Sequence, residues 1–430
     1  MSLHKLICSC ILALCSLLPL AAGATGITNY PVLVNSSYWT AQNQNGDKLV
    51  LDAAGVANFN AKVRQASRTV VDLLNYPATF GGDSLKTKIM DYSVLDDDLY
   101  LHGNKVSENY KNILRKQTNV AAIPQTVNVR YAVTVRRTAV RALPTGEGLY
   151  YYASDRDFDA LQETMLDPGE PLIVLHTSSN GFFYYVQSVN YSGWVSKYNV
   201  ALTDKNSWLG YAKPQKFLVV TDANYILKTA GENVLYQQGA RLPVDSEQNN
   251  LYTVLAPVRS QYGGLQKQKL FVQKSTEGLH YGYLPYTTNN IIRSAFKFYN
   301  MPYGWGGLKD SVDCSSLVFN AYRTVGIVLP RNADEQELSA GQTHKLSGTS
   351  GERTAVINAL QPGACLYMDG HTLMYIGKVN GDPYTIHSLG SYYNKGVRQR
   401  EMRVVVSDLA LTRANGNSFL QELTTAKEFK

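Results

Sequence analysis

Cysteine is scarce in this chain of 430 residues: there are five, and Cys8, Cys10 and Cys15 crowd the N-terminus. Only Cys314 and Cys365 remain, too few to hold together a chain of this length, so a disulfide-dominated fold is excluded. Charged residues make up 17% of the sequence and form no long block of one sign, which argues against a nucleic-acid partner. Beyond residue 24 no stretch reaches the ~18 consecutive apolar residues of a membrane-spanning helix, so no integral membrane segment is expected.

Several catalytic motifs are also missing. The sequence has no His-Glu-x-x-His zinc motif, no Gly-x-Ser-x-Gly elbow and no phosphate-binding loop. These absences argue against the zinc peptidases, the serine hydrolases of the α/β type and the P-loop nucleotidases. No metal and no cofactor is expected.

The composition indicates a multidomain, β-rich protein. At roughly 150 residues per domain the length suggests about three domains, and 44% hydrophobic residues are enough for real cores. Tyrosine (30) far outnumbers phenylalanine (12) and tryptophan (4), which suits β-rich domains with amphipathic surfaces. The net charge of +7 is a mild basic excess that favours anionic partners.

Residues 1–24 have the pattern of a secretory signal peptide. Lys5 precedes an apolar run that ends in small residues at Ala22, Gly23 and Ala24. An uncleaved anchor and lipidation at Cys15 are the alternatives, although Leu14 stands where a lipidation signal needs a small residue. The mature protein is expected to be periplasmic or secreted.

The rest of the chain divides into regions with different patterns of hydrophobic and turn-forming residues. Residues 25–125 are predicted to be a helical N-terminal domain, because Val56, Phe59 and Val63 recur at helical spacing. Residues 126–205 and 206–286 each contain short strand-like runs separated by Gly, Asn and Pro turns, which predicts two small β-barrels. Residues 287–430 begin with helices, the first capped by Thr287 or Thr288, and continue with strands, which predicts an α+β domain.

The chemistry is concentrated in residues 302–317. A glycine-rich loop leads into Cys314 at the predicted first turn of a helix. The free N–H groups and the positive end of the helix dipole stabilise a thiolate there and can also bind an oxyanion, so we expect a lowered thiol pKa. His371 opens one downstream strand and His387 ends the next. If these strands are neighbours, His371 can face Cys314 while His387 orients it.

The first barrel, residues 126–205, resembles the bacterial SH3-like domains that precede cell-wall peptidases, and the second, residues 206–286, is expected to be an SH3-like barrel as well. The resemblance rests on Phe158 to Thr164, on the turn from Asp167 to Pro171, and on Gly193-Trp194-Val195.

The last region resembles the NlpC-type papain-like cysteine peptidases. The matching motifs are Tyr303-Gly304-Trp305-Gly306-Gly307, then Asp313-Cys314-Ser315-Ser316-Leu317, then His371 and His387. The resemblance implies Cys314 as nucleophile, His371 as general base and then acid, His387 as the orienting third member, and Tyr303 as a hydroxyl donor at the oxyanion site. It also implies that Asp313 and Ser315 line the substrate groove.

The resemblance further implies a substrate. Such enzymes cut peptidoglycan stem peptides, typically between γ-D-glutamate and meso-diaminopimelate, and some require a free N-terminal L-alanine. An acidic residue after the catalytic helix receives that amine, but here neutral Asn332 occupies the expected place and Asp334 lies two residues further. Asn332 and Asp334 are therefore candidate substrate-binding residues, and the free-amine requirement stays open.

Three alternatives remain at this stage. A Cys314–Cys365 disulfide would leave a non-catalytic cell-wall-binding protein. An amidase or acyltransferase would use the same Cys and His pair. A zinc site of Cys314, His371 and His387 is disfavoured, because a helix N-terminus repels a cation. A monomer is expected.

Overall fold

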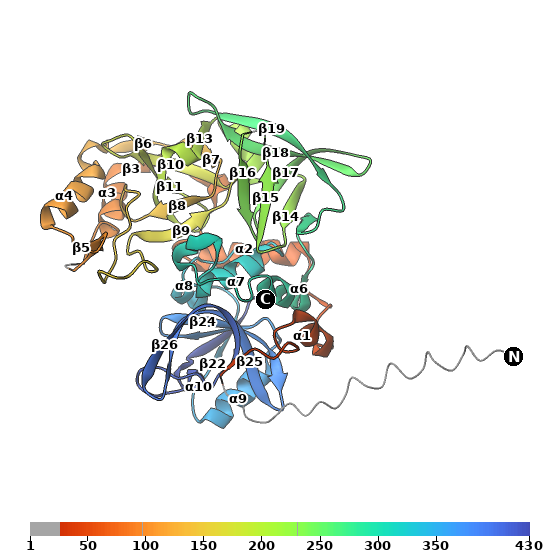
Figure 1. The fold of residues 1–430 in the computed structure, drawn as a ribbon. Coiled ribbons are helices and arrows are strands. Elements are labelled where there is room, and N and C mark those ends of the chain that lie inside the picture. The colour runs from red at the N-terminus through yellow and green to blue at the C-terminus, as the bar shows by residue number, and fades with distance from the viewer. Residues whose placement is uncertain (1–25, 97, 230) are drawn as a thin grey trace.

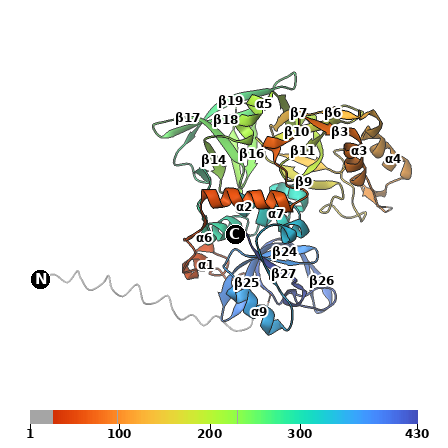
Figure 2. The ribbon, with the colours of Figure 1, turned by 180° about the vertical axis from the view of Figure 1, so that it is seen from behind.

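The computed structural model describes residues 26–96, 98–229 and 231–430, so the predicted signal peptide, residues 1–24, lies outside the described residues. Two β-rich units lie side by side above an α/β unit formed by the C-terminal part of the chain (Figure 1). Helix α2 (Ala53–Ala66) runs between the two levels, and the reverse view shows it along its whole length (Figure 2). No helix in the part of the chain that the structure describes is long and apolar enough to cross a membrane.

The C-terminal unit is built on one antiparallel sheet. In spatial order its strands are β1 (Ile27–Thr28), β26 (Val397–Asp408), β25 (Asp382–Asn394), β24 (His371–Val379), β23 (Cys365–Met368), β27 (Thr425–Glu428) and β22 (Gln342–Lys345). Its helices are α6 (Thr288–Phe296), α7 (Cys314–Arg323), α8 (Ala333–Leu338), α9 (Ser350–Ala359) and α10 (Phe419–Glu422).

Alternation along the strands divides this sheet between two cores. On β24, Met374 and Ile376 belong to the core that contains α6 and α7, whereas Leu373 and Tyr375 belong to the core that contains α9 and α10. Thr287 caps α6 by accepting a hydrogen bond from the Asn290 N–H at 3.2 Å, which confirms the predicted helix start.

The first β-rich unit is a seven-stranded sheet. The spatial order is β13 (Val200–Thr203), β7 (Arg130–Thr134), β10 (Pro171–Thr177), β11 (Phe183–Gln187), β12 (Ser192–Ser196), β8 (Thr138–Arg141) and β9 (Gln162–Leu166). Helix α5 (Lys205–Ala212) packs Trp208 and Tyr211 into its core beside Trp194. We call this unit barrel 1.

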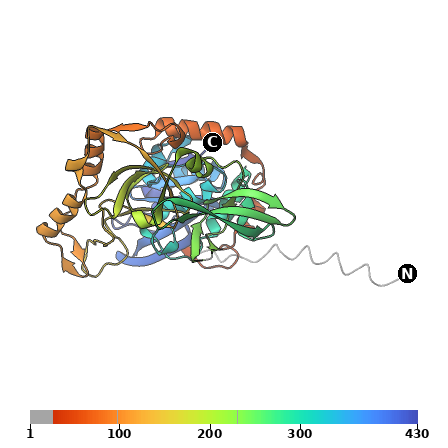
Figure 3. The ribbon, with the colours of Figure 1, turned by 90° about the horizontal axis from the view of Figure 1, so that it is seen from above.

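The second β-rich unit has its own core, centred on Leu218, Tyr236 and Val254. It consists of the sheet β19 (Leu265–Gln273), β18 (Leu251–Arg259), β17 (Arg241–Gln248), β14 (Phe217–Val220) and β20 (Leu279–Tyr281), and the hairpin β15 (Asn224–Lys228) and β16 (Asn233–Gln237). We call it barrel 2, and the view from above shows its long green strands projecting to one side (Figure 3).

The N-terminal region, predicted as one helical domain over residues 25–125, is divided between two neighbours. Trp39, Phe59 and Val63, from α1 (Ser36–Gln42) and α2, share the core of the C-terminal unit, and β2 (Leu49–Leu51) pairs with β21 (Tyr286–Thr287). Leu85 and Leu114, further along, instead pack against barrel 1. This second part contains β3 (Thr79–Gly81), α3 (Gly82–Asp91), β4 (Tyr100–Leu101), β5 (Asn104–Lys105), α4 (Glu108–Gln117) and β6 (Thr126–Asn128).

Candidate active site

Cys314 is the first residue of α7, and local hydrogen bonds define the start of this helix. Asp313 is the N-cap: its carboxylate accepts from the Ser316 N–H at 2.8 Å, and the Ser316 hydroxyl accepts from the Asp313 N–H at 2.8 Å. This reciprocal capping box holds Cys314 in the first turn, as the sequence predicted. The preceding loop has left-handed backbone at Gly306 (φ 53°) and Gly307 (φ 82°), which favours glycine at both positions.

The Cys314 thiol keeps its proton at pH 7. Burial and the Asp313 carboxylate raise the pKa of Cys314 to about 11, although the N–H groups of Thr372 and Ser315 act in the opposite direction. The predicted lowering of this pKa is therefore wrong. The sequence places Cys314 at a helix N-terminus, but it does not reveal that the site is buried next to a carboxylate.

The two predicted histidines form a hydrogen-bonded pair. The distance from His371 Nε2 to His387 Nδ1 is 2.8 Å, and the distance from His387 Nε2 to Ser407 Oγ is 2.9 Å. Both rings also lie against Phe419, with ring centres 5.9 and 6.1 Å away. Because Nε2 of His371 is engaged by His387, Nδ1 is the nitrogen left for a reacting partner.

The start of β24 lies next to the thiol. The Thr372 N–H acts on the Cys314 sulfur as a hydrogen-bond donor, and Thr372 directly follows His371. Burial lowers the pKa of His371 to about 3, and burial together with His371 lowers the pKa of His387 far below its usual range. Both imidazoles are therefore neutral at pH 7, and neutral imidazole is the form that can accept a proton.

Tyr303 is buried at the same place. Burial and the neighbouring Cys314 and Asp313 raise the pKa of its hydroxyl well above the usual value, so the hydroxyl keeps its proton and can donate a hydrogen bond. Its ring packs against Phe158 of barrel 1, with centres 5.8 Å apart.

A buried ion pair between Arg331 and Asp313 lies next to the nucleophile, because Asp313 directly precedes Cys314. The Arg331 guanidinium contacts both carboxylate oxygens of Asp313, one of them at 3.2 Å, and also donates to Ser315 Oγ at 2.9 Å and to Thr164 Oγ1 at 2.8 Å. Arg331 holds the pKa of Asp313 below its ordinary value against the effect of burial. The sequence analysis had no role for Arg331, because its partners lie up to 167 positions away in the chain.

These residues line a cavity of about 590 Å³. The predicted substrate-binding residues all lie in its wall, together with the nucleophile and the tyrosine: Asp313, Ser315, Asn332, Asp334, Cys314 and Tyr303. His371 and His387 are buried and do not line this cavity: their rings pack against Phe419 of α10, and within the described residues no hydrogen bond joins either ring to Cys314.

Barrel 1 completes the wall with residues that the sequence analysis did not select. Glu163 lines the cavity beside Tyr191, and its carboxylate accepts a hydrogen bond from the Tyr191 hydroxyl. Burial raises the pKa of Glu163. Gln162 donates to the Gly306 carbonyl at 2.9 Å and so ties barrel 1 to the glycine loop. Glu163 belongs to the SH3-like motif in the sequence, but only the docking of the barrel brings it to the cavity.

Cys314 and Cys365 are both free thiols in the structure, so the alternative disulfide is not formed. Cys365 is completely buried in β23, and burial raises its thiol pKa. Within the described residues, no group of three or more His, Cys, Asp or Glu side chains is arranged to hold a metal ion.

Comparison with known proteins gives two domain matches. Residues 300–410 match the NlpC/P60 family, and residues 149–196 match the SH3 domain of SH3b1 type. The resemblances predicted for these two parts of the sequence are confirmed.

Whole proteins similar to this chain include two curated bacterial enzymes. A dipeptidyl-peptidase 6 from Lysinibacillus sphaericus is 23% identical over 223 residues, which covers 49% of this chain and 75% of the relative. The bifunctional muramidase/DL-endopeptidase CwlT from Bacillus subtilis strain 168 is 28% identical over 106 residues, which covers 24% of this chain and 30% of the relative.

A solved structure shares the overall fold. It is described as a novel NlpC/P60 endopeptidase from Photobacterium damselae subsp. piscicida, and it superposes with a TM-score of 0.76 over 94% of this chain and 98% of its own. The sequence identity is 18%, so the likeness concerns the fold.

Proposed function

Because the chain carries an NlpC/P60 domain with an SH3-type domain before it, we propose that it is an exported cysteine endopeptidase that hydrolyses peptidoglycan stem peptides. The observation that supports this most is the position of Cys314. It begins a capped helix, lines a cavity of about 590 Å³, and accepts from the N–H of the residue that follows His371.

The hydrogen-bond chain suggests a path for the proton. With Nδ1 of His371 free to accept, its Nε2–H donates to His387 Nδ1, and His387 Nε2–H donates to Ser407 Oγ. As Cys314 Sγ attacks the peptide carbonyl, the thiol proton passes to His371 Nδ1; the two groups must approach for this transfer, because no hydrogen bond joins them in the described structure. The imidazolium retains its bond to His387, and its charge stabilises the sulfur as that becomes a thiolate.

The remaining steps use the same groups. The Cys314 N–H and the Tyr303 hydroxyl stabilise the oxyanion, and His371 returns its proton to the leaving amine. A thioester between Cys314 and the acyl part of the substrate remains. Water, deprotonated by His371, then cleaves the thioester and regenerates the thiol.

The cavity wall supports cleavage between γ-D-glutamate and a diamino acid such as meso-diaminopimelate, with a free N-terminal L-alanine on the substrate. Glu163 is a carboxylate in the wall and provides the countercharge for an ammonium group that Asn332 lacks. Tyr191 orients this carboxylate, and Ser315, held by Arg331, presents a hydroxyl to the same space. Asp334, contributed by α8, adds a second carboxylate to the wall.

The test is digestion of defined stem peptides with mass analysis of the products. We expect L-Ala-γ-D-Glu-meso-diaminopimelate with a free amine to be cut after the glutamate, and the same peptide capped by N-acetylmuramic acid to be cut much more slowly. Cys314→Ala should lower kcat by about 10⁴-fold or more. Cys365→Ala is the matched control, because it removes the other free thiol, and it should retain cleavage.

Full cleavage by Cys314→Ala would contradict the assignment of the nucleophile. Equal cleavage of the free and capped peptides would contradict the amine site while leaving the peptidase activity in place. A product whose mass shows acyl transfer in place of hydrolysis would support the transferase alternative.

A further inference from the structure

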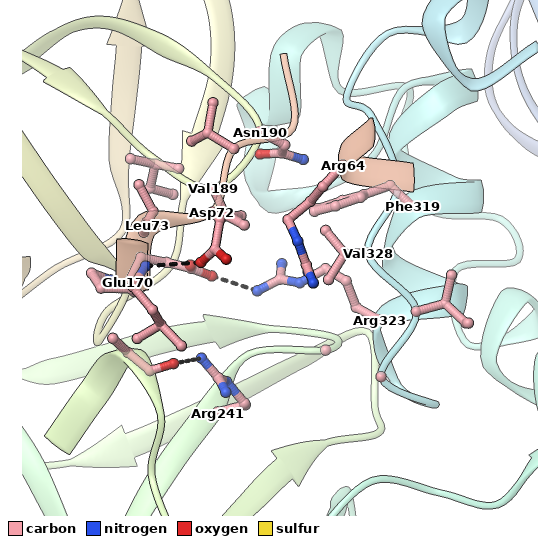
Figure 4. Close-up of a pocket in the computed structure, with 18 of the residues that line it drawn as sticks. Arg64, Asp72, Leu73, Glu170, Val189, Asn190, Arg241, Phe319, Arg323 and Val328 are labelled. Carbon is pink, nitrogen blue, oxygen red and sulfur yellow. Dashed lines mark hydrogen bonds and ion pairs between the residues drawn. The ribbon is translucent and has the colours of Figure 1, made fainter. Parts of the chain in front are cut away.

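A second cavity lies where four parts of the fold meet. It has a volume of about 230 Å³ and is walled by α2, barrel 1, barrel 2 and α7 (Figure 4). Strand β9 contributes to both cavities: Gln162 and Glu163 reach the active-site cavity, and Thr164 to Leu166 reach this one. Similarly, Asn190 lines this cavity, whereas its neighbour Tyr191 lines the active-site cavity. We call it the junction cavity.

Much of the junction cavity is apolar. Side chains from barrel 1, the N-terminal region and the catalytic unit form this part of the wall, among them Leu73, Met165, Val189, Phe319 and Val328. An apolar wall of this kind favours a ligand with a hydrophobic body.

Within the described residues, Arg64 is a cation of the cavity wall that has no counterion. The Arg64 side chain extends from the C-terminal turn of α2 into the cavity (Figure 4). Among the described residues no acceptor forms a hydrogen bond or ion pair with Arg64. The side chain is half-buried, so the guanidinium is partly withdrawn from water without a protein partner.

The other charged groups near the wall have hydrogen-bond partners, but those of Asp72 are neutral and leave its negative charge uncompensated. Glu170 and Asp167 both bind Arg323, the latter at 3.0 Å. The Asp72 carboxylate caps its own turn by accepting from the Leu74 N–H at 3.1 Å and from the Asn75 amide at 2.9 Å.

Arg241 also lacks a carboxylate partner. Its hydrogen bonds go to the carbonyl groups of Tyr211 and Ala212, at 3.3 and 3.4 Å, and its guanidinium lies over the Phe217 ring, 5.7 Å from the ring centre, so none of its partners in the described chain is a carboxylate. Among the described residues, the wall therefore contains two arginines, Arg64 and Arg241, that form no ion pair with an acidic side chain, and one carboxylate, Asp72, that forms no ion pair with a basic one.

We propose that the junction cavity is a binding site for a small organic carboxylate with an apolar body. The carboxylate binds the Arg64 guanidinium, which can donate two parallel hydrogen bonds to it, and the apolar body packs against Phe319 and Val328. A volume of about 230 Å³ suits a molecule of roughly ten non-hydrogen atoms. Such a ligand contacts all four parts of the fold at once and stabilises their association. Ligand binding at this site requires no hydrolytic activity, so this proposal can be tested independently of the proposed peptidase activity.

The test is calorimetric titration of the full mature chain with N-acetyl-L-leucine, which has a carboxylate and a branched apolar body. N-acetyl-L-leucinamide is the uncharged control ligand and should bind at least tenfold more weakly. Arg64→Gln should weaken binding of the acid by at least about tenfold. Arg68→Gln is the matched control variant, because Arg68 lies on the same segment but does not line the junction cavity, and its affinity should be unchanged.

Val328→Phe provides a second variant, because the larger ring fills part of the cavity and should abolish binding. Circular dichroism shows whether this variant is folded, and Arg64→Gln decides the question if it is not. The proposal is overturned if wild type gives no binding heat up to about 10 mM ligand, if the amide binds as well as the acid, or if Arg64→Gln binds like wild type.

Discussion

The Gln162–Leu166 strand lines both cavities, and the two differ in whether their charged side chains have partners of opposite charge or hydrogen-bond partners within the protein. In the active-site cavity the buried Asp313 carboxylate is neutralised by Arg331, and the Glu163 carboxylate is held by the Tyr191 hydroxyl. In the junction cavity Arg64 has no protein partner within the described chain, although Glu170 and Asp167 lie in or near the same wall and are bound to Arg323.

The difference indicates what each cavity is built for. Charges paired inside the protein position other groups, as Arg331 positions Asp313 and Ser315 around Cys314. A partly buried charge without a partner is unfavourable unless something from outside supplies the partner. The active-site cavity is therefore organised for chemistry on a substrate, and the junction cavity for holding an anion.

Apart from replacement of Cys314 itself, the largest effect is expected at the histidine pair. His371→Ala removes the group that accepts the thiol proton, and the Cys314 pKa of about 11 leaves almost no thiolate at pH 7 to replace it. We expect kcat for the free-amine tripeptide to fall by about 10²- to 10⁴-fold. His387→Ala, which leaves the base but removes its hydrogen-bond partner, should cost less. Equal activity of His371→Ala and wild type would contradict the assignment of His371 as the group that accepts the thiol proton.

A large loss of stability is expected from Arg331→Met. Removing the guanidinium leaves the Asp313 carboxylate buried without a countercharge, which costs about 3–5 kcal/mol in the free energy of unfolding. The measurement is denaturant unfolding followed by tryptophan fluorescence. Arg400→Gln is the control, because Arg400 forms an exposed pair with Asp157 and its loss should cost about 1 kcal/mol or less. Similar losses in both variants would show that burial of the first pair is unimportant.

Glu163→Gln should affect recognition of the substrate amine. Loss of a charged hydrogen bond worth about 1.5–3 kcal/mol lowers kcat/KM for the free-amine peptide by about 10- to 100-fold. The capped peptide should be cut at the wild-type rate. A variant that slows both substrates equally would assign Glu163 a structural role.

The same variant predicts a change in the pH profile. Burial raises the pKa of Glu163, so the carboxylate gains a proton at a higher pH than an ordinary glutamate and loses its charge there. In wild type, kcat/KM for the free-amine peptide should decline as the pH falls through this raised pKa. In Glu163→Gln that decline should disappear, because the amide does not titrate in this range.

The smallest effect is expected from Glu170→Gln in the junction cavity. The substitution frees one side of Arg323 while Asp167 still neutralises it, which adds positive charge to the wall. N-acetyl-L-leucine should bind about two- to fivefold more tightly, as expected for a partly exposed ion pair. Weaker binding would indicate that Glu170 itself contacts the ligand.

Sequence reasoning predicted the local features of the site because they depend on neighbouring residues. Cys314 at a helix start follows from Asp313 and Ser316, which form the capping box within four positions. The strand that begins at His371 follows from the Asp369-Gly370 turn before it. The division of the N-terminal region was not predictable, because helical spacing shows that a helix has an apolar face but not which neighbour covers that face.

The amino-acid sequence by itself determined the elements, the two domain types and the order of Cys314, His371 and His387 along the chain. Tertiary structure alone decided that the half-buried thiol keeps its proton, that Arg331 neutralises Asp313, that Glu163 reaches the catalytic cavity, and that Arg64 has no ion-pair partner among the described residues. The physical reason is that burial and charge pairing depend on which groups the packing of the four parts brings together, whether they are 18 positions apart, as Arg331 and Asp313 are, or 167, as Arg331 and Thr164 are.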